Sequence, residues 1–275
     1  MPAKRTTRGR RSPLKGSPLR QAGQSVDDQI FDLAYDKVLT PFTFAAFLVA
    51  IAVLEWAKEL TGAGPNPEIW TAIAIIASGI AGVRIWSARK RLAQLRQGRD
   101  GEIAVGQFLD RLREEGAQVF HDVPGPGFNV DHVVIAEQGI FVVETKTWSK
   151  PNGRKACIDF DGKRLYIDGQ PAIGDPAGQA RAQAAWIRRL IRELTGRDFR
   201  CRAVLAFPGW FIEPEAQKRA MASKNPFWLL EPKAFPHWLR RRDAVVKKSD
   251  VRLISFHLSQ AVRRAGRGSI DAEAL

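Results

Sequence analysis

Two carboxylates and one ammonium group stand at the end of a predicted β-hairpin. Residues 129–146 form two apolar, β-branched runs joined by a turn at Glu137-Gln138. Counting outward from a two-residue turn places Asp131 opposite Glu144, and strand alternation places Lys146 on the face of Glu144. Opposed side chains on one face have Cβ atoms about 5 Å apart. We therefore expect Asp131, Glu144 and Lys146 to converge.

Such a cluster suits a divalent metal ion. Two carboxylates at this distance repel each other and shift each other's pKa, and a cation between them removes the repulsion. Mg²⁺ takes one or two carboxylates and keeps several waters, so we expect Asp131 and Glu144 to bind Mg²⁺ or Mn²⁺. Lys146 would then orient an attacking water or help to deprotonate it. The alternative is an edge hairpin whose charged end faces solvent, with His132 on the opposite face as a structural residue.

The chain resembles a known family through four segments in a fixed order. Asp131, followed after an apolar strand by Glu144-Thr145-Lys146, resembles the D…(D/E)-x-K core of the restriction-endonuclease-like nucleases. More narrowly, Gly101-Glu102, residues 130–134, residues 139–146 and residues 175–179 together resemble the nuclease-related domain (NERD) family. The resemblance covers roughly residues 98–207. Asp175-Pro176 stands where the family commonly has Asn-Pro, and both Asp and Asn cap helices.

The resemblance implies an α/β fold, with a restriction-endonuclease-like αβββαβ core whose mixed central sheet is flanked by helices. It also implies that Glu102 and Gln179 join Asp131, Glu144 and Lys146 in the catalytic site. The residues alone leave both additions open. Glu102 would lie in the first turn of a predicted helix at 102–115, where the helix dipole favours an anion in any case. Gln179 could bind a water or phosphate oxygen, or only satisfy a loop carbonyl.

The strong positive charge indicates an anionic partner. The net charge is +14 and the pI about 10.3, which fits nucleic acid or an anionic lipid surface. Candidate phosphate contacts near the predicted site are Lys150 and Arg154 in the loop after Lys146, and Arg181 and Arg188 on a predicted helix at 176–194. A solvated loop and a solvated helix face are the alternatives. The two cysteines lack metal-binding spacing, so we expect reduced thiols.

Two apolar runs precede the nuclease-like region and predict a helical hairpin that spans a membrane. They cover residues 41–54 and 69–83, near the lower limit of about 17 to 25 residues for a span. Trp56, Trp70 and Trp86 stand at their ends, where interfacial aromatic residues belong. Lys and Arg flank the pair on both outer sides, so we expect both termini and the nuclease-like domain in the cytoplasm, at the inner or plasma membrane. A buried soluble hairpin, or one lying in the membrane plane, is the alternative.

The chain therefore divides into five predicted regions. These are a basic disordered tail with a short amphipathic helix (1–40), the transmembrane hairpin (41–88), a basic linker (89–99), the nuclease-like domain (100–207) and a C-terminal extension (208–275). Residues 98–101 contain two glycines and predict a break before the first helix of the domain. Further predicted strands are 119–121, 157–160, 164–167, 201–207 and 227–230, and further helices are 25–40, 234–241 and 253–265.

The favoured function is that of a membrane-anchored, metal-dependent nuclease that hydrolyses phosphodiester bonds of nucleic acid, with DNA favoured. Asp131 and Glu144 would hold the metal, with the Thr145 carbonyl as a further ligand. One alternative is a non-catalytic, membrane-tethered module that binds nucleic acid or protein on a nuclease-like fold. Another is a membrane structural protein whose basic segments bind anionic lipid. The sequence leaves DNA versus RNA, endo- versus exonuclease action and the oligomeric state open.

Overall fold

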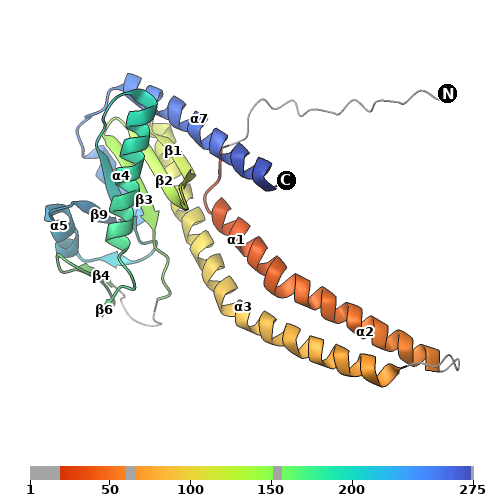
Figure 1. Cartoon of the computed structure of the whole chain (residues 1–275). Coiled ribbons are helices and arrows are strands. Elements are labelled where there is room, and N and C mark those ends of the chain that lie inside the picture. Colours follow the sequence, from red (N-terminus) through yellow and green to blue (C-terminus); the bar gives the residue numbers. More distant parts are fainter. Residues whose placement is uncertain (1–18, 60–65, 151–156, 274–275) are drawn as a thin grey trace, which may run out of the picture.

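The computed structural model of the chain describes residues 19–59, 66–150 and 157–273. A long helical hairpin extends from one side of an α/β domain (Figure 1). The predicted basic tail falls mostly outside the described residues, as does most of the loop between the two apolar runs.

The hairpin consists of two rods that pack along each other. The first rod comprises α1 (Gln24–Ala34), a π-helical stretch (Tyr35–Leu39) and α2 (Thr40–Glu59), which follow without interruption. The predicted helix at 25–40 is thus present and continues directly into the first apolar run. Leu48 and Ala52 of α2 are buried against Ala74 of the second rod, whereas the outward side chains are exposed.

The second rod is α3 (Pro67–Asp110), a single helix of 44 residues that runs from the hairpin into the domain. The predicted break at residues 98–101 is therefore wrong. Glycine lowers helix stability by about 1 kcal/mol relative to alanine, but tertiary packing overrides this cost. A Cβ atom at Gly101 would lie 1.9 Å from Thr147 Oγ1, so the glycine permits a close approach between α3 and the chain after β3.

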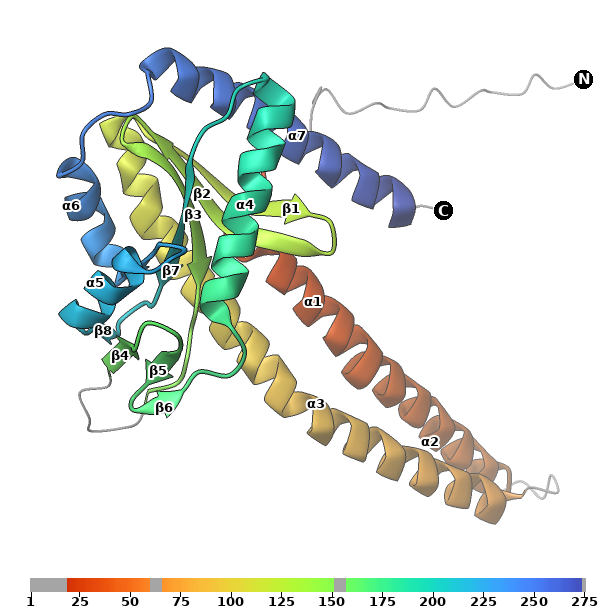
Figure 2. The same cartoon turned by 60° about the vertical axis from the view of Figure 1, so that its left-hand side comes forward.

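The domain is built on a mixed five-stranded sheet (Figure 2). Its strands are β1 (Gln118–Gly125), β2 (Phe128–Ala136), β3 (Gly139–Thr145), β7 (Cys201–Ala206) and β9 (Phe227–Leu230), in the order β1-β2-β3-β7-β9. The first three strands are antiparallel, and β3, β7 and β9 are parallel to one another. The helix Pro176–Thr195 (α4) provides the crossover from β3 to β7, as parallel strands require.

Helices cover both faces of this sheet, so the predicted α/β class is confirmed. One face packs against α4 (Pro176–Thr195), α5 (Pro214–Ala222) and α7 (Lys248–Glu273), and the other against the domain end of α3 and α6 (Phe235–Arg240). Asp175 caps α4 by accepting a hydrogen bond from the Gly178 amide at 2.8 Å. The helix ends at Gly196, whose φ of +70° suits glycine.

A small second sheet lies beside the first and contains the predicted hairpin at 157–167. Its strands are β4 (Cys157–Phe160), β5 (Leu165–Ile167), β6 (Gln170–Pro171) and β8 (Phe211–Ile212), in the order β6-β5-β4-β8. Two 3₁₀ helices, Arg111–Glu115 and Pro232–Ala234, complete the elements of the described residues. Sequence patterns did not predict β6, β8 or α5, and α7 begins five residues before the predicted start at residue 253.

Candidate active site

The β2–β3 hairpin has the predicted register. Ala136 pairs with Gly139, and His132 pairs with Val143, so the intervening turn is Glu137-Gln138. Continuing the same register places Asp131 opposite Glu144. The two carboxylates therefore belong to one row across the strands, as the residue count implied.

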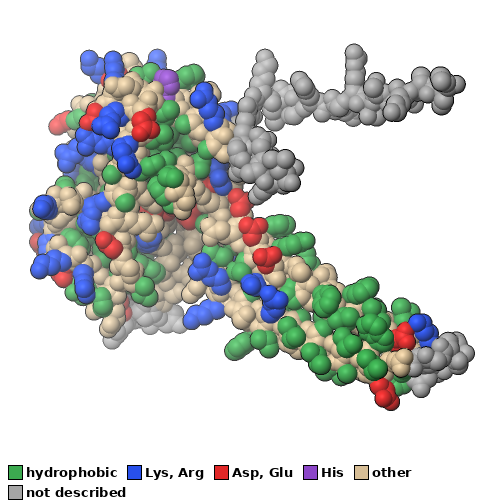
Figure 3. Space-filling view, viewed as in Figure 1, with side chains coloured by type: hydrophobic (Ala, Val, Ile, Leu, Met, Phe, Trp, Pro, Cys, Tyr) green, Lys and Arg blue, Asp and Glu red, His purple; other side chains and the backbone are tan. Residues whose placement is uncertain are grey.

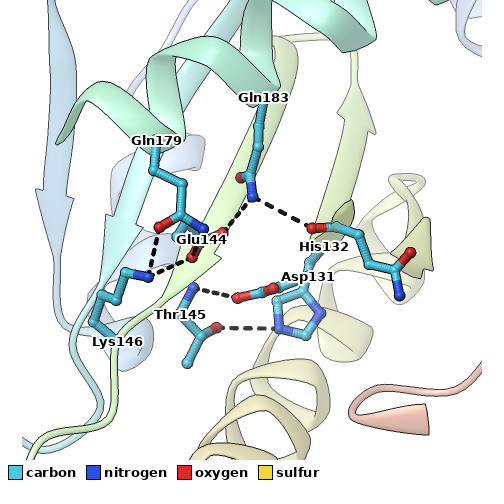
Figure 4. A network of polar contacts seen from close by, with 8 residues as sticks. Asp131, His132, Glu144, Thr145, Lys146, Gln179 and Gln183 are labelled. Atoms are coloured by element: carbon cyan, nitrogen blue, oxygen red, sulfur yellow. Dashed lines mark hydrogen bonds and ion pairs between the residues drawn. The ribbon is translucent and has the colours of Figure 1, made fainter. Parts of the chain in front are cut away.

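Glu144 is the centre of a polar network at the end of β3 (Figure 4). Its side chain is buried, and Oε1 accepts hydrogen bonds from Lys146 Nζ at 2.6 Å and from Gln179 Nε2 at 2.7 Å. Lys146 Nζ also donates to Gln179 Oε1 at 2.9 Å. The structure thus brings Glu144, Lys146 and Gln179 together, with the ammonium group fixed between a carboxylate and an amide oxygen.

Gln183 is a second amide in this network, and sequence reasoning missed it. Its Nε2 donates to Glu144 Oε2 at 2.7 Å and approaches the Asn129 carbonyl at 3.3 Å. The available signal was its spacing, because residues four apart share a helix face and Gln183 follows Gln179 by one turn. Its Oε1 is buried and has no hydrogen-bond partner among the described residues, which leaves one acceptor open inside the site.

Asp131 lies beside Thr145, whose backbone amide donates to Asp131 Oδ2 at 2.6 Å. The N–H and C=O of one strand residue project toward the same edge, so the Thr145 carbonyl also faces the β2 side. Burial, and then repulsion by Glu144 and Glu102, hold the pKa of Asp131 well above its usual range. The Thr145 hydrogen bond and the Lys146 charge oppose this rise without cancelling it.

Glu102 comes to the same site from α3. It lies in the interior of a helix that starts at Pro67, so a first-turn position does not explain its presence. Burial raises its pKa to about 7, and repulsion by Asp122 and Glu144 adds to this effect. The electrostatic influence of Glu102 on Asp131 shows that α3 supplies a carboxyl group to the cluster.

Asp122 is a further carboxylate that sequence reasoning did not single out. The β1–β2 register pairs His121 with His132 and Val123 with Val130, so Asp122 of β1 lies opposite Asp131 of β2. It therefore extends the row of Asp131 and Glu144 across the strands. It is buried and adopts a φ of +48°, which is uncommon for a residue other than glycine. Arg20 Nε lies 2.6 Å from its Oδ2, and the Ser25 amide donates to the same atom at 3.0 Å. The segment before α1 therefore neutralises this carboxylate.

A chain of hydrogen bonds runs beneath the site on the opposite face of the sheet. Thr145 Oγ1 lies 3.3 Å from His132 Nε2, and the Nδ1 atoms of His132 and His121 are 2.9 Å apart. His121 Nε2 lies 3.1 Å from Asp110 Oδ1. Because an ionised carboxylate only accepts, neutral imidazoles permit one direction: Thr145 donates to His132, His132 to His121, and His121 to Asp110.

The surroundings of both imidazoles favour the neutral form. Burial lowers the pKa of His121, and burial together with the His121 charge lowers the pKa of His132 to about 3. A neutral pair is the state that the hydrogen-bond direction requires. His132 therefore lies on the face opposite the carboxylates and contributes to structure, as its position in the strand predicted.

The oxygen atoms at the site fit a hard divalent cation. Among the described residues, no three Asp, Glu, His or Cys side chains lie close enough to hold a metal ion by themselves. Two carboxylates, Asp131 and Glu144, and the Thr145 carbonyl are nevertheless the type of donor that Mg²⁺ and Mn²⁺ take together with water. Burial is the main cause of the raised pKa of Asp131, and a cation at the site would relieve the additional repulsion by Glu144 and Glu102.

The predicted phosphate contacts lie away from the carboxylates. Lys150 Nζ bonds to the Gly209 carbonyl and lies 5.5 Å from the Trp210 ring centre. Arg181 lies 5.3 Å from the Phe227 ring centre, and Arg188 Nε donates to Asp198 at 2.7 Å. Arg154 lies outside the described residues. The structure therefore places Arg181 and Arg188 on the flank of α4 rather than in the polar network.

Comparison with known proteins supports a nuclease relationship for this region. The family model described as nuclease-related domain (NERD) matches residues 97–208. An uncharacterized protein of Bacillus anthracis is 40% identical over 57 residues, which is 19% of this chain and 27% of the relative's length. No solved structure matches the chain. The matched region contains α4, the β2–β3 hairpin and all the carboxylates of the site, so residues 97–208 are the part of the chain that is similar to the nuclease-related domain (NERD) family.

Proposed function

We propose that this protein is a membrane-anchored, metal-dependent nuclease that hydrolyses phosphodiester bonds of nucleic acid, with DNA favoured, on the cytoplasmic side of the membrane. The observation that carries this proposal is the convergence of Asp131, Glu144, Lys146 and Gln179 at one end of β3. A family relationship to nucleases supports the same reaction class.

The side chains have complementary tasks in this reaction. Asp131, Glu144 and the Thr145 carbonyl would hold Mg²⁺ or Mn²⁺, which supplies positive charge at the phosphate and lowers the pKa of water. Lys146, fixed by Glu144 and Gln179, orients the attacking water, and its ammonium group stabilises the charge that develops on the phosphate. With a pKa of about 7, Glu102 can take up or release a proton near neutral pH.

The hairpin supports the membrane anchor. The segments Gln24–Lys58 and Pro67–Glu115 contain stretches with mean hydropathy of 2.1 and 1.7, long and apolar enough to cross a membrane. Apolar side chains cover the outer surface of α2 and of the neighbouring part of α3 (Figure 3), and Phe47 and Ile75 are 62% and 67% exposed. Lipid would cover this surface, and the basic residues that follow Trp86 support a cytoplasmic position of the domain.

One observation favours a second function. Both oxygens of Glu144 already accept hydrogen bonds from side chains, so this carboxylate is satisfied without a metal ion. A nuclease-like module that binds nucleic acid without cutting it would need no metal ion at Glu144, and the side-chain hydrogen bonds would be enough to keep this carboxylate buried.

Cleavage assays separate the two functions. The full-length chain, in phosphatidylcholine nanodiscs, is incubated with plasmid, linear DNA and RNA in Mg²⁺, Mn²⁺ or EDTA. We expect cutting in Mg²⁺ or Mn²⁺, none in EDTA, and none by Glu144→Gln in any condition. Binding without cutting in every metal would establish the non-catalytic module instead.

A further inference from the structure

A second concave surface lies along the flank of α4. This arginine groove has a volume of about 1140 Å³ and runs between α4, the first residues of β7 and β9, and the chain after α6. Arg181, Arg188, Arg189 and Arg192 form its α4 wall. Arg200 and Arg202 at the start of β7, with Arg242 from the opposite side, place positive charge on the other walls.

The positive charge of the arginine groove is largely uncompensated. Asp198 is the only acidic residue in its lining among the described residues, and it pairs with Arg188. Burial lowers the pKa of Arg202, and the charges of Arg200 and Arg242 lower it further, as expected for cations that repel one another without a counterion. An anion in the groove would relieve this repulsion.

Aromatic rings hold two of these guanidinium groups. The Trp228 ring centre lies 5.7 Å from Arg202 and 5.3 Å from Arg242. Arg242 also lies 5.1 Å from the Trp238 ring centre. Contacts of this kind orient a guanidinium without neutralising it, so its N–H groups remain available for bidentate bonds to phosphate.

If the α2–α3 hairpin spans a membrane, the arginine groove lies on the side of the domain away from the lipid. In Figure 1, α5 and β9 lie on the side of the domain away from the α2–α3 hairpin. Lys and Arg side chains gather on that side (Figure 3). A bilayer around α2 and the start of α3 would lie at the other side of the molecule.

The shape of the arginine groove suits a single polynucleotide strand. Arg181 to Arg192 span about 16 Å along the axis of α4, a length over which an extended polynucleotide backbone presents more than one phosphate. Positive charge on several walls can surround one flexible backbone, whereas a duplex would present only an edge to it. Arg181 follows Gln179 by two residues, so this end of the groove is the nearer one to the polar network.

We propose that the arginine groove binds the sugar–phosphate backbone of a single-stranded nucleic acid. The inference rests on the proposed function, because it takes the bound strand to be the substrate of the nuclease. Beyond the groove, the same strand would pass the start of α4 and reach the polar network. Single-stranded DNA or RNA, or the unpaired tail of a duplex, is then the preferred substrate class.

Binding measurements on the full-length chain in phosphatidylcholine nanodiscs test this assignment. With EDTA present to prevent cutting, fluorescence anisotropy is measured with a labelled 12-nucleotide single strand, a 12-base-pair duplex and polyglutamate. We expect the duplex and polyglutamate to bind about tenfold more weakly than the single strand. The double variant Arg202→Gln and Arg242→Gln should lose about tenfold in single-strand affinity, and the slope of log affinity against log salt should fall by about 1.4.

A matched control removes the same charge elsewhere. Arg252→Gln with Arg264→Gln lies on α7 outside the groove lining and should change affinity less than about twofold. Because Arg202 packs on aromatic rings, a second double variant, Arg189→Gln with Arg192→Gln, uses exposed α4 positions and should lose affinity without loss of fold. Unchanged single-strand binding by this exposed variant, equal loss in the control, or equally tight binding of duplex or polyglutamate would overturn the assignment.

Cleavage in Mg²⁺, measured in parallel, separates this inference from the proposed function. If the wild-type chain never cuts but binds single strands in a way that the groove variants weaken, the proposed nuclease activity is wrong and the proposed binding site stands. If the wild-type chain cuts and the groove variants bind and cut as well as the wild type, the proposed binding site is wrong and the proposed nuclease activity stands.

Discussion

Gln183 Nε2 lies 2.7 Å from Glu144 Oε2, and Gln179 Nε2, one turn earlier on α4, lies 2.7 Å from Glu144 Oε1. One helix thus supplies a donor to each oxygen of a buried carboxylate at the end of a strand. The crossover that makes β3 and β7 parallel therefore also fixes the orientation of Glu144.

Gln183→Leu should lower both stability and cleavage. It leaves Glu144 Oε2 buried without its donor, which costs about 1 to 3 kcal/mol in unfolding free energy. Thermal unfolding and initial cleavage rates measure the two effects. Gln260→Leu, on the exposed side of α7, is the control and should change neither. Wild-type cleavage by Gln183→Leu would show that Gln183 does not position Glu144.

Glu102→Gln should stabilise the metal-free protein at alkaline pH. The pKa of Glu102 is about 7 in the folded chain and 4.5 in the reference state, so the folded state holds the proton more strongly. Its contribution is fully present below pH 4.5 and is lost as pH rises through 7. In EDTA we expect a gain on the order of 2 kcal/mol at pH 8 and little change at pH 4.5, measured by denaturant unfolding. Equal effects at both pH values would contradict the raised pKa.

Asp131→Ala, Glu144→Ala and Lys146→Ala should each abolish metal-dependent cleavage. The carboxylate variants should also weaken Mg²⁺ binding, measured by calorimetry, and Asp131→Ala should raise metal-free thermal stability by relieving repulsion. Lys146→Ala should keep metal binding and lose turnover. Affinity for nucleic acid should survive all three changes. Any of these variants that cuts at the wild-type rate is not part of the catalytic machinery.

Acid should destabilise the domain through His132. Its pKa is 6.5 in the reference state and about 3 in the folded chain, so the unfolded state takes up the proton first. The contribution of His132 is fully present above pH 6.5 and is lost as pH falls toward 3, by at most about 1.4 kcal/mol per pH unit. His132→Gln cannot titrate in this range, and unfolding free energies at pH 7, 6, 5 and 4 should show a shallower decline. An unchanged slope would assign the acid sensitivity to other groups.

The proposed topology places the C-terminus in the cytoplasm. An enzymatic reporter fused after Leu275 should be active only in the cytoplasmic compartment, because basic residues flank both apolar runs on their outer sides. Fusions after Lys58, near the tip of the hairpin, provide the control and should report the opposite side. Activity of the Leu275 fusion outside the cytoplasm would contradict the topology.

The sequence predicted the centre of the site because strand geometry is local. A two-residue turn permits one register, and alternation then decides that Glu144 and Lys146 share a face. Asp122 could not be found in this way, because its place in the row depends on the β1–β2 register across the Pro126-Gly127 turn. Gln183 required knowledge of which side of α4 faces the end of β3.

The sequence did not predict that α3 is one continuous helix, and the reason is different. Glycine at 98 and 101 predicts a break when only local propensity is considered. The structure shows that Gly101 serves the close approach of Thr147, a contact between segments far apart in the chain. Local rules cannot reveal a contact of that kind.

If the hairpin spans a membrane, this unbroken helix also determines the distance between the site and the lipid. About 24 Å of helix separates Trp86, at the end of the apolar run, from Glu102. A flexible tether would let the domain swing over its surroundings, whereas a helix that enters the domain core acts as a rigid spacer. In the proposed membrane-anchored nuclease, substrates would have to come within this fixed reach of the membrane, and any tilt of the span would turn the Glu102 carboxyl with it.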